Sequence, residues 1–332
     1  MGTNKKKKMR KLLIICLTIA LVSCNRIENP SGETPINFDR VLTKAVVDDV
    51  EDIDAFGVYA QISTTPEGTD YVSLMTNERV YQSDSEWTYD NKCYWIKDRK
   101  YRFFSIYPYE TNSSNIVFTT HRQNGRNYDG YQISFVLPES TDTDLMTASK
   151  NVTVGPNQTV YENVVLSFKH ELAKININVA KNRANANNRV EVTSITLGGI
   201  WKNGTLNTAF DPEFTTNWSF YGSTTTNIWK NFDNGKVIST DNTPMIEDIM
   251  LMPQNIGAQS IPIYITYKFY GVGGDLQNTT TATAYIPMGK WDAAKNYTYN
   301  IILAAEDNTI KISTPIVASW GALQSGSTII IQ

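Results

Sequence analysis

The sequence predicts an all-β protein built from antiparallel β-sandwiches. Its short apolar stretches alternate with polar residues at a period of two, as strands with one buried face do. Aromatic and β-branched residues dominate these stretches. Prolines and Asn-Gly pairs, which favour turns, lie between the stretches or at their ends. These observations favour sheets packed face to face.

The predicted strands follow one another along most of the chain. Alternation is clearest at residues 101–107, 131–137 and 174–179. Further strands are expected at residues 190–197, 261–270, 281–286, 297–303 and 328–331.

The chain begins with the pattern of a bacterial secretory signal. Lys5 to Lys8 supply a cationic start, residues 12–22 an apolar middle, and Ser23 a small residue before Cys24. An apolar run of about 11 residues is too short to cross a hydrocarbon core of about 30 Å, which disfavours a membrane anchor. A plain signal peptide cleaved near Ser23 is the other alternative. The pattern resembles the lipobox of bacterial lipoproteins, which implies that Cys24 becomes the acylated N-terminus.

The order of these features suggests a domain division. We assign a lipoprotein signal peptide to residues 1–23 and a tether to residues 24–34. Turn-forming residues at 155–158 interrupt two runs of strands, so a boundary is expected near residue 160. The sequence therefore predicts an N-terminal β-sandwich domain at residues 35–160 and a C-terminal one at residues 161–332.

Composition argues against several classes of function. The net charge is only −3, which favours neither nucleic acid nor an anionic membrane surface as a partner. His121 and His170 are the two histidines, and neither has histidine or cysteine neighbours at metal-ligand spacing. A Gly-x-Ser-x-Gly elbow and a phosphate-binding loop are both absent from the sequence. We expect neither an enzyme nor a cofactor or metal site. The acidic cluster at residues 48–54 is read as a solvated linker, with a weak calcium site as the alternative.

Several different short sequence motifs follow one another in a fixed order from residue 36 almost to residue 332. They are Ile36-Asn37-Phe38, Thr43-Lys44-Ala45, Phe56-Gly57-Val58-Tyr59-Ala60 and Lys92-Cys93-Tyr94-Trp95, followed by residues 101–109, 144–148, 165–175, 197–200, 204–205, 251–254, 291, 296–301 and 315–320. In this order they resemble the fimbrillin family of Bacteroidota, including its Mfa-like members, which are lipoprotein precursors of pilus subunits.

The resemblance implies a fold and an assembly mechanism. It implies two transthyretin-like sandwiches, anchorage of the precursor at the cell outer membrane, and removal of the first strand by a trypsin-like protease. That strand would contain Ile36 and Phe38. The groove left behind would accept a strand from another fimbrial subunit, with backbone hydrogen bonds giving affinity and alternate side chains giving specificity.

The resemblance leaves two details open. Cleavage is expected between Lys44 and Ala45, where many relatives carry Arg in place of Lys, and cleavage between Arg40 and Val41 is the alternative. The C-terminal run with Ile329, Ile330 and Ile331 is either a strand donated to a neighbour or the closing strand of the second sandwich.

A surface lipoprotein that binds glycans and never polymerises is the alternative function. The polar region at residues 215–243 carries several aromatic side chains, and a host or bacterial surface glycan or protein is a possible partner. The stacking platforms for sugar rings would be Trp201, Trp218, Tyr221 and Trp229. The alternative interpretation is that these aromatic side chains belong to irregular strands and are buried in the core.

Overall fold

The computed structural model describes residues 33–38, 42–43, 53–84, 86–109, 116–123, 127–141, 143–210, 214–220 and 222–320. Several residues singled out above lie outside the described residues: Cys24, Arg40, Val41, Lys44, Ala45, Tyr221, Ile329, Ile330 and Ile331.

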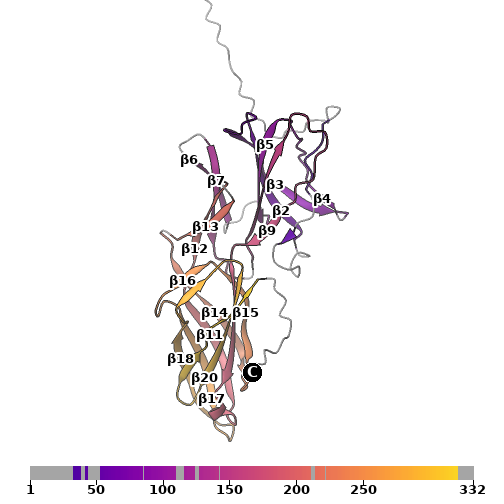
Figure 1. Ribbon diagram of the computed structural model, residues 1–332. Coiled ribbons are helices and arrows are strands. Elements are labelled where there is room, and N and C mark those ends of the chain that lie inside the picture. Colours follow the sequence, from indigo (N-terminus) through magenta and orange to yellow (C-terminus); the bar gives the residue numbers. More distant parts are fainter. Residues whose placement is uncertain are drawn as a thin grey trace, which may run out of the picture.

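Two sheets form the upper part of the molecule in Figure 1. The larger sheet has the order β1 (Leu42–Thr43), β9 (Ser167–His170), β8 (Met146–Val154), β5 (Arg99–Tyr107), β2 (Ala55–Ser63), β3 (Tyr71–Ser83) and β4 (Glu86–Thr88). The smaller sheet has the order β13 (Thr215–Ser219), β12 (Asn203–Ala209), β7 (Asn127–Val136) and β6 (Ile116–Gln123).

A second pair of sheets forms the lower part, where they pack face to face (Figure 1). One contains β15 (Thr243–Leu251), β10 (Ala173–Lys181), β20 (Lys295–Ala304) and β21 (Thr309–Ile312), with β22 (Ile316–Ser319) also pairing with β20. The other contains β14 (Thr225–Val237), β11 (Val190–Trp201), β17 (Pro262–Tyr270) and β18 (Leu276–Tyr285). Between the two parts lies a ribbon of β16 (Gln254–Ile256) and β19 (Gly289–Trp291).

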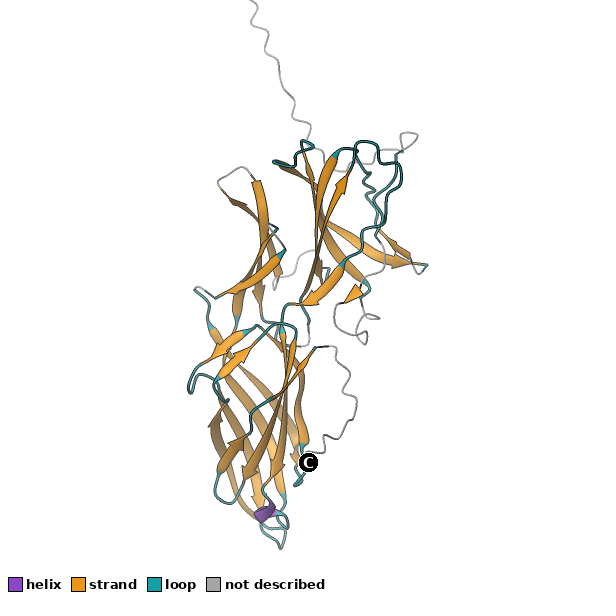
Figure 2. Cartoon of the chain, viewed as in Figure 1, coloured by secondary structure: helices purple, strands orange, loops and turns teal. Residues whose placement is uncertain are grey.

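The all-β prediction is confirmed. In the described residues the regular structure is strand, apart from one 3₁₀ turn at Arg183–Asn185 (Figure 2). All the strands predicted between residues 101 and 303 are present, and the one expected at residues 328–331 lies outside the described residues. Most pairings are antiparallel, but β1–β9 and β10–β20 are parallel. Sequence alternation does not encode strand direction, because both directions bury every second residue.

Strand pairing crosses residue 160 in several places. Strand β9 follows that residue and still pairs with β8, and the β12–β13 hairpin adds to β7 in the smaller upper sheet. Gly130 on β7 allows β12 to lie this close, because a Cβ atom at residue 130 would be 1.8 Å from the carbonyl oxygen of Thr208 on β12. The division at residue 160 thus stays a prediction, and the sheets are shared between chain segments on both sides of it.

The stretch from β11 to β12 is one of the places where the chain passes between the two parts of the molecule. Strand β11 belongs to the lower sandwich, and β12, which follows it directly, belongs to the smaller upper sheet (Figure 1). A bulge between Leu197 and Ile200 lies in this stretch, and Gly199 adopts a φ of +71° there. A side chain at Gly199 would also clash, because its Cβ would lie 2.2 Å from the Ser260 carbonyl oxygen.

The central strands of the larger upper sheet are buried on both faces. All nine residues of β2 are buried. Phe56 and Phe103 face one apolar cluster, and Tyr59 and Phe104 face another, which continues into the lower sandwich. Among the described residues, no sheet covers the face of the larger upper sheet that carries Phe56 and Phe103, so shorter segments cover it.

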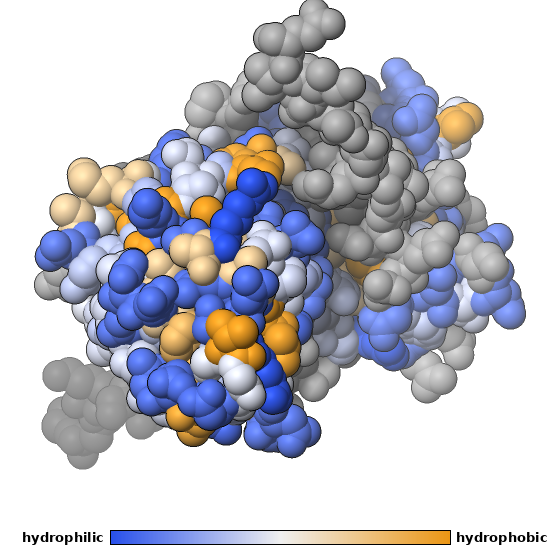
Figure 3. Space-filling model, turned by 90° about the horizontal axis from the view of Figure 1, so that it is seen from below, coloured by the Kyte–Doolittle hydropathy of each residue, from blue (hydrophilic) through white to orange (hydrophobic). Residues whose placement is uncertain are grey.

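The far end of the lower sandwich, seen from below in Figure 3, carries apolar residues scattered among hydrophilic ones.

Candidate functional site

The first described segment, residues 33–38, covers this second face of the larger upper sheet. Ile36 is fully buried and Phe38 is 4% exposed. The Phe38 ring packs edge-on against Tyr89 and Phe103, with ring centroids 5.6 and 6.1 Å apart. Because Ile36 and Phe38 are two residues apart, their side chains lie on one face of the segment, as in a strand with one buried face. Both side chains are part of the N-terminal core.

Backbone hydrogen bonds hold this segment between two stretches that are far away in sequence. The Ile36 N–H donates to the Cys93 carbonyl oxygen over 2.8 Å, and the Trp95 N–H donates to Thr34 over 3.0 Å. On the other side, the Val164 N–H donates to the Asn37 carbonyl oxygen over 2.7 Å. The segment therefore bridges two stretches of chain as a short added strand would.

Tyr89 forms a hydrogen bond with the middle of the segment. Its hydroxyl donates to the Ile36 carbonyl oxygen over 2.7 Å and accepts a bond from the Cys93 N–H over 3.1 Å. Burial raises the pKa of Tyr89, so the hydroxyl keeps its proton and stays a donor. Nothing in the local sequence marks Tyr89, because its partner lies 53 residues earlier in the chain.

The chain then passes to the edge of the larger sheet. Leu42 and Thr43 form β1, which pairs in parallel with Ser167 and Phe168 of β9. Both predicted cleavage points lie outside the described residues, but the sequence places them on opposite sides of β1. Arg40 precedes β1 and Lys44 follows it directly. A cut after Lys44 would therefore release the whole first segment together with β1, whereas a cut after Arg40 would leave β1 on the sheet.

A buried polar cluster joins the two upper sheets at the point where the chain passes from β9 to β10. The Glu171 carboxylate accepts hydrogen bonds from Thr147 over 2.5 Å and from Thr216 over 3.0 Å. The Lys169 ammonium lies 3.4 Å from it. Burial raises the pKa of Glu171, while Lys169 and the hydroxyl donors act in the opposite direction. The cluster ties β8 to the β12–β13 hairpin.

The last described residue is anchored beside this cluster. Trp320 is 2% exposed and stacks on His170, with ring centroids 4.2 Å apart. His170 Nδ1 lies 2.6 Å from Asp144 Oδ2. The Lys174 ammonium lies 4.8 Å from the centroid of the Trp320 ring. The chain consequently leaves the described fold at the junction of the two parts.

Two of the four aromatic residues proposed as sugar platforms are used for packing. Trp201 and Trp218 both stack on Phe220, with ring centroids 5.2 and 6.0 Å from that of Phe220. The Trp218 indole N–H donates to the Glu171 carbonyl oxygen over 2.9 Å. Trp229 is 64% exposed. The core interpretation holds for Trp201 and Trp218, and Trp229 is left as a surface residue.

Two kinds of site were not found in the described part of the chain. No group of three or more His, Cys, Asp or Glu residues there is arranged to hold a metal ion. Among the same residues, no helix has the length and apolar character needed to cross a bilayer.

Comparison with known proteins gives a family and a fold. The family model described as fimbrillin-like matches residues 43–320. A fimbrial protein from Bacteroides vulgatus has a similar structure, with a TM-score of 0.63 and 19% identity, covering 86% of this chain and 99% of that one. A protein from Bacteroides ovatus, described as a cell adhesion protein, is similar with a TM-score of 0.53 and 15% identity, covering 87% and 98%. Comparison with curated protein sequences gives no match.

Proposed function

Since the chain belongs to the fimbrillin-like family, we propose that it is a structural or adhesive subunit of a cell-surface pilus, with no catalytic role. We further propose that it assembles by losing its first segment and accepting a strand from another subunit. The observation that carries this proposal is the way Ile36 and Phe38 fill an apolar groove that the rest of the domain leaves open.

Removing the first segment would expose both the apolar side chains and the backbone polar groups that it now covers. The apolar wall includes Tyr89, Phe103 and Val164, which are buried in the same cluster as Phe38. The Cys93 carbonyl and the N–H groups of Trp95 and Val164 would lose their partners in the segment. Unpaired buried polar groups and bare apolar surface are both costly, and an extended strand from another chain restores both kinds of contact.

The parallel pairing of β1 favours Lys44 over Arg40 as the cleavage point. A cut after Arg40 leaves Leu42 and Thr43 paired with β9 at the edge of the sheet. That remnant would occupy the edge that an incoming strand needs. A trypsin-like protease acting between Lys44 and Ala45 removes the obstruction along with the segment.

Before cleavage, Cys24 would hold the precursor at the outer membrane through its acyl chains. Nine residues lie between Cys24 and Thr34, the first of the described residues with a backbone bond to the domain, and this tether includes Pro30 and Gly32. Cleavage would release the domain from the lipid and open the groove in one step. In this scheme Cys24 is a temporary anchor.

Sequencing the N-terminus of the surface-assembled protein tests the scheme. We expect assembled subunits to begin at Ala45, and a Lys44→Gln variant to stay monomeric and lipid-anchored. Lys150→Gln, which changes an exposed lysine on β8, is the matched control and should assemble normally. Subunits that begin at Val41 would move the cleavage to Arg40. Assembled subunits that still carry Ile36 and Phe38 would refute strand removal.

A further inference from the structure

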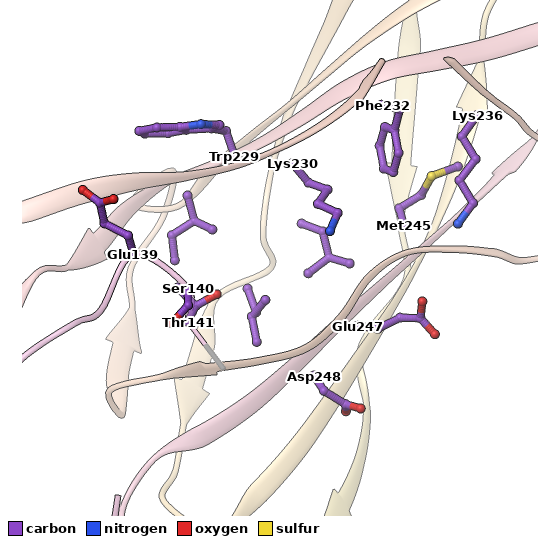
Figure 4. Close-up of a pocket in the computed structure, with 13 residues that line it drawn as sticks. Glu139, Ser140, Thr141, Trp229, Lys230, Phe232, Lys236, Met245, Glu247 and Asp248 are labelled. Atoms are coloured by element: carbon purple, nitrogen blue, oxygen red, sulfur yellow. The ribbon is translucent and has the colours of Figure 1, made fainter. Parts of the chain in front are cut away.

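Strand β14 forms one wall of a groove in the lower sandwich, and its last residues depart from regular pairing. The groove lies between the edge strands β14 and β15 and has a volume of about 630 Å³. Figure 4 shows Lys236 and other side chains of β14 along it. Asn231 lies opposite Ser194 of β11, whereas Lys236 lies opposite Val192. Residues 232–235 therefore correspond to one residue of β11 and form an irregular bulge.

This bulge contains the Asn-Gly pair Asn234-Gly235. Asn234 is exposed, and among the described residues none forms a hydrogen bond with its side chain. Gly235 has a φ of +68°, which residues other than glycine rarely adopt. Neither residue has a partner in the register of β14 with β11. The side-chain amide of Asn234 is therefore in solvent, next to a main-chain N–H that the β11–β14 pairing does not fix.

A second Asn-Gly pair, Asn203-Gly204, lies within a regular strand. Asn203 is opposite Val136 of β7, and Gly204 is opposite Phe135. The side-chain oxygen of Asn203 accepts hydrogen bonds from the N–H and the hydroxyl of Thr224, over 3.1 and 3.2 Å. The same dipeptide thus occurs once in a paired strand and once in an exposed bulge. A third pair, at residues 124–125, lies outside the described residues.

We propose that Asn234-Gly235 is a site of spontaneous deamidation in the folded protein, whereas Asn203-Gly204 is protected by its strand. Deamidation begins with attack by the main-chain nitrogen of the second residue on the side-chain carbonyl carbon of the first. The two groups must move toward each other for this attack. A paired strand prevents that movement until it opens locally, and an exposed bulge does not.

The chemistry at Asn234 needs only water. The Gly235 nitrogen loses its proton to hydroxide and forms a bond to the Asn234 side-chain carbon. The bond from that carbon to the amide nitrogen then breaks, and the nitrogen leaves as ammonia after taking a proton from water. Water opens the resulting succinimide ring at either carbonyl and gives aspartate or isoaspartate at position 234. No group is oxidised or reduced. Gly235 leaves the approach unhindered because it has no Cβ.

The new carboxylate would arise next to a buried ion pair. A Cβ atom at Gly235 would lie 3.3 Å from the Cβ of Glu191, so the bulge packs against that side chain. Glu191 is 4% exposed, pairs with Arg189 and accepts a hydrogen bond from the Tyr270 hydroxyl over 2.7 Å. A second negative charge one residue away repels the Glu191 carboxylate. Deamidation should therefore loosen the end of β14 against β11. None of this depends on pilus assembly, so either proposal can fail alone.

Peptide mapping by mass spectrometry tests the inference on the folded protein, incubated at mildly alkaline pH. We expect the peptide with Asn234 to gain the mass difference between an amide and a carboxyl group at least about tenfold faster than the peptide with Asn203. Isoaspartate should be among the products, because direct hydrolysis of the side chain does not form it. Equal rates at the two sites, or a product at position 234 without isoaspartate, would overturn the inference.

The unfolded protein is the matched control for the two sites. In denaturant both pairs are exposed, so their rates should agree within about threefold. A difference that persists in denaturant would mean that neighbouring residues, and not the fold, set the rates, and it would overturn protection by β12. Asn234→Gln should abolish the product at position 234, because a glutamine would have to form a larger ring. Asn231→Gln on the same strand should leave the rate at Asn234 unchanged.

Asn234→Asp tests the effect on the strand, because it adds the charge without lengthening the main chain. We expect the amides of residues 236 and 237 to exchange hydrogen at least about threefold faster than in the unaltered protein. Those of β21 should keep their rates. Asn231→Asp places the same charge opposite Ser194 and is the matched control. Equal exchange in the two variants would refute repulsion of Glu191.

Discussion

Tyr89 connects the first segment to the rest of the fold through both its hydroxyl and its ring. Its hydroxyl is at once donor to Ile36 and acceptor from Cys93, so a single side chain joins the segment to the stretch it pairs with. The ring of Tyr89 also forms part of the wall against which Phe38 packs. A buried tyrosine supplies apolar area and a polar handle together.

Replacing Tyr89 with Phe should destabilise the uncleaved domain by about 1–2 kcal/mol. The ring and its packing stay, but a buried carbonyl and a buried N–H lose a partner. The free energy of unfolding from denaturant titration measures the effect. Tyr264→Phe is the matched control, because Tyr264 is exposed on β17. A loss no larger than that of the control would mean that the Tyr89 hydroxyl does not hold the segment.

At the scale of elements, the first segment differs from the described strands of the larger upper sheet. It bonds to Cys93 and Trp95 on one side and to Val164 on the other, instead of lying within a sheet. The central strands of the larger upper sheet pair over longer stretches, such as the nine residue pairs between β5 and β8, whereas β1 at its edge pairs over only two. With few backbone bonds, this segment should detach more easily than the central strands.

A Phe38→Ala change should loosen the segment and accelerate cleavage after Lys44. Removing a buried phenylalanine costs about 3–5 kcal/mol, and the loss here falls on an element that opens locally. Limited trypsin digestion followed by mass spectrometry of the N-terminus measures the rate. Val160→Ala, at a position 78% exposed, should leave the rate unchanged. Equal rates in the Phe38 variant and the unaltered protein would mean that the segment does not limit access to the cleavage point.

At the scale of the whole molecule, the two parts are joined through buried contacts rather than through a single linker. The β11–β12 stretch runs through both parts, and the Glu171 cluster and the Trp320 stack lie at their junction. Further backbone bonds cross there, such as the one from Met250 to Thr141 over 2.7 Å. The junction therefore contributes to the stability of both parts.

Glu171 should make this stability depend on pH. Its pKa is higher in the folded chain than in the unfolded one because burial disfavours the ionised form. Stabilisation from this source is present at low pH and is lost as the pH rises through the folded pKa. The unaltered protein should therefore gain stability relative to Glu171→Gln as the pH falls from about 7 to about 4. Denaturant titrations at several pH values measure this, with Glu162→Gln at an exposed position as the background. A difference that does not vary with pH would contradict the prediction.

The sequence alone determined the fold class and the positions of the main strands. Each of these follows from local periodicity and turn residues, which a short window of sequence contains. The family resemblance, carried by phrases in a fixed order, agrees with the family match over residues 43–320.

Only the tertiary structure decided which segments meet. The Tyr89 clamp, the Val164 contact and the addition of the β12–β13 hairpin to β7 join residues far apart in the chain. The sequence also did not reveal that β1–β9 and β10–β20 pair in parallel, since the alternation of apolar and polar residues is the same in both directions. The groove between β14 and β15 likewise exists only because two sheets bring their edges together. Periodicity fixes which face of a strand is buried, and packing over the whole chain fixes what it is buried against.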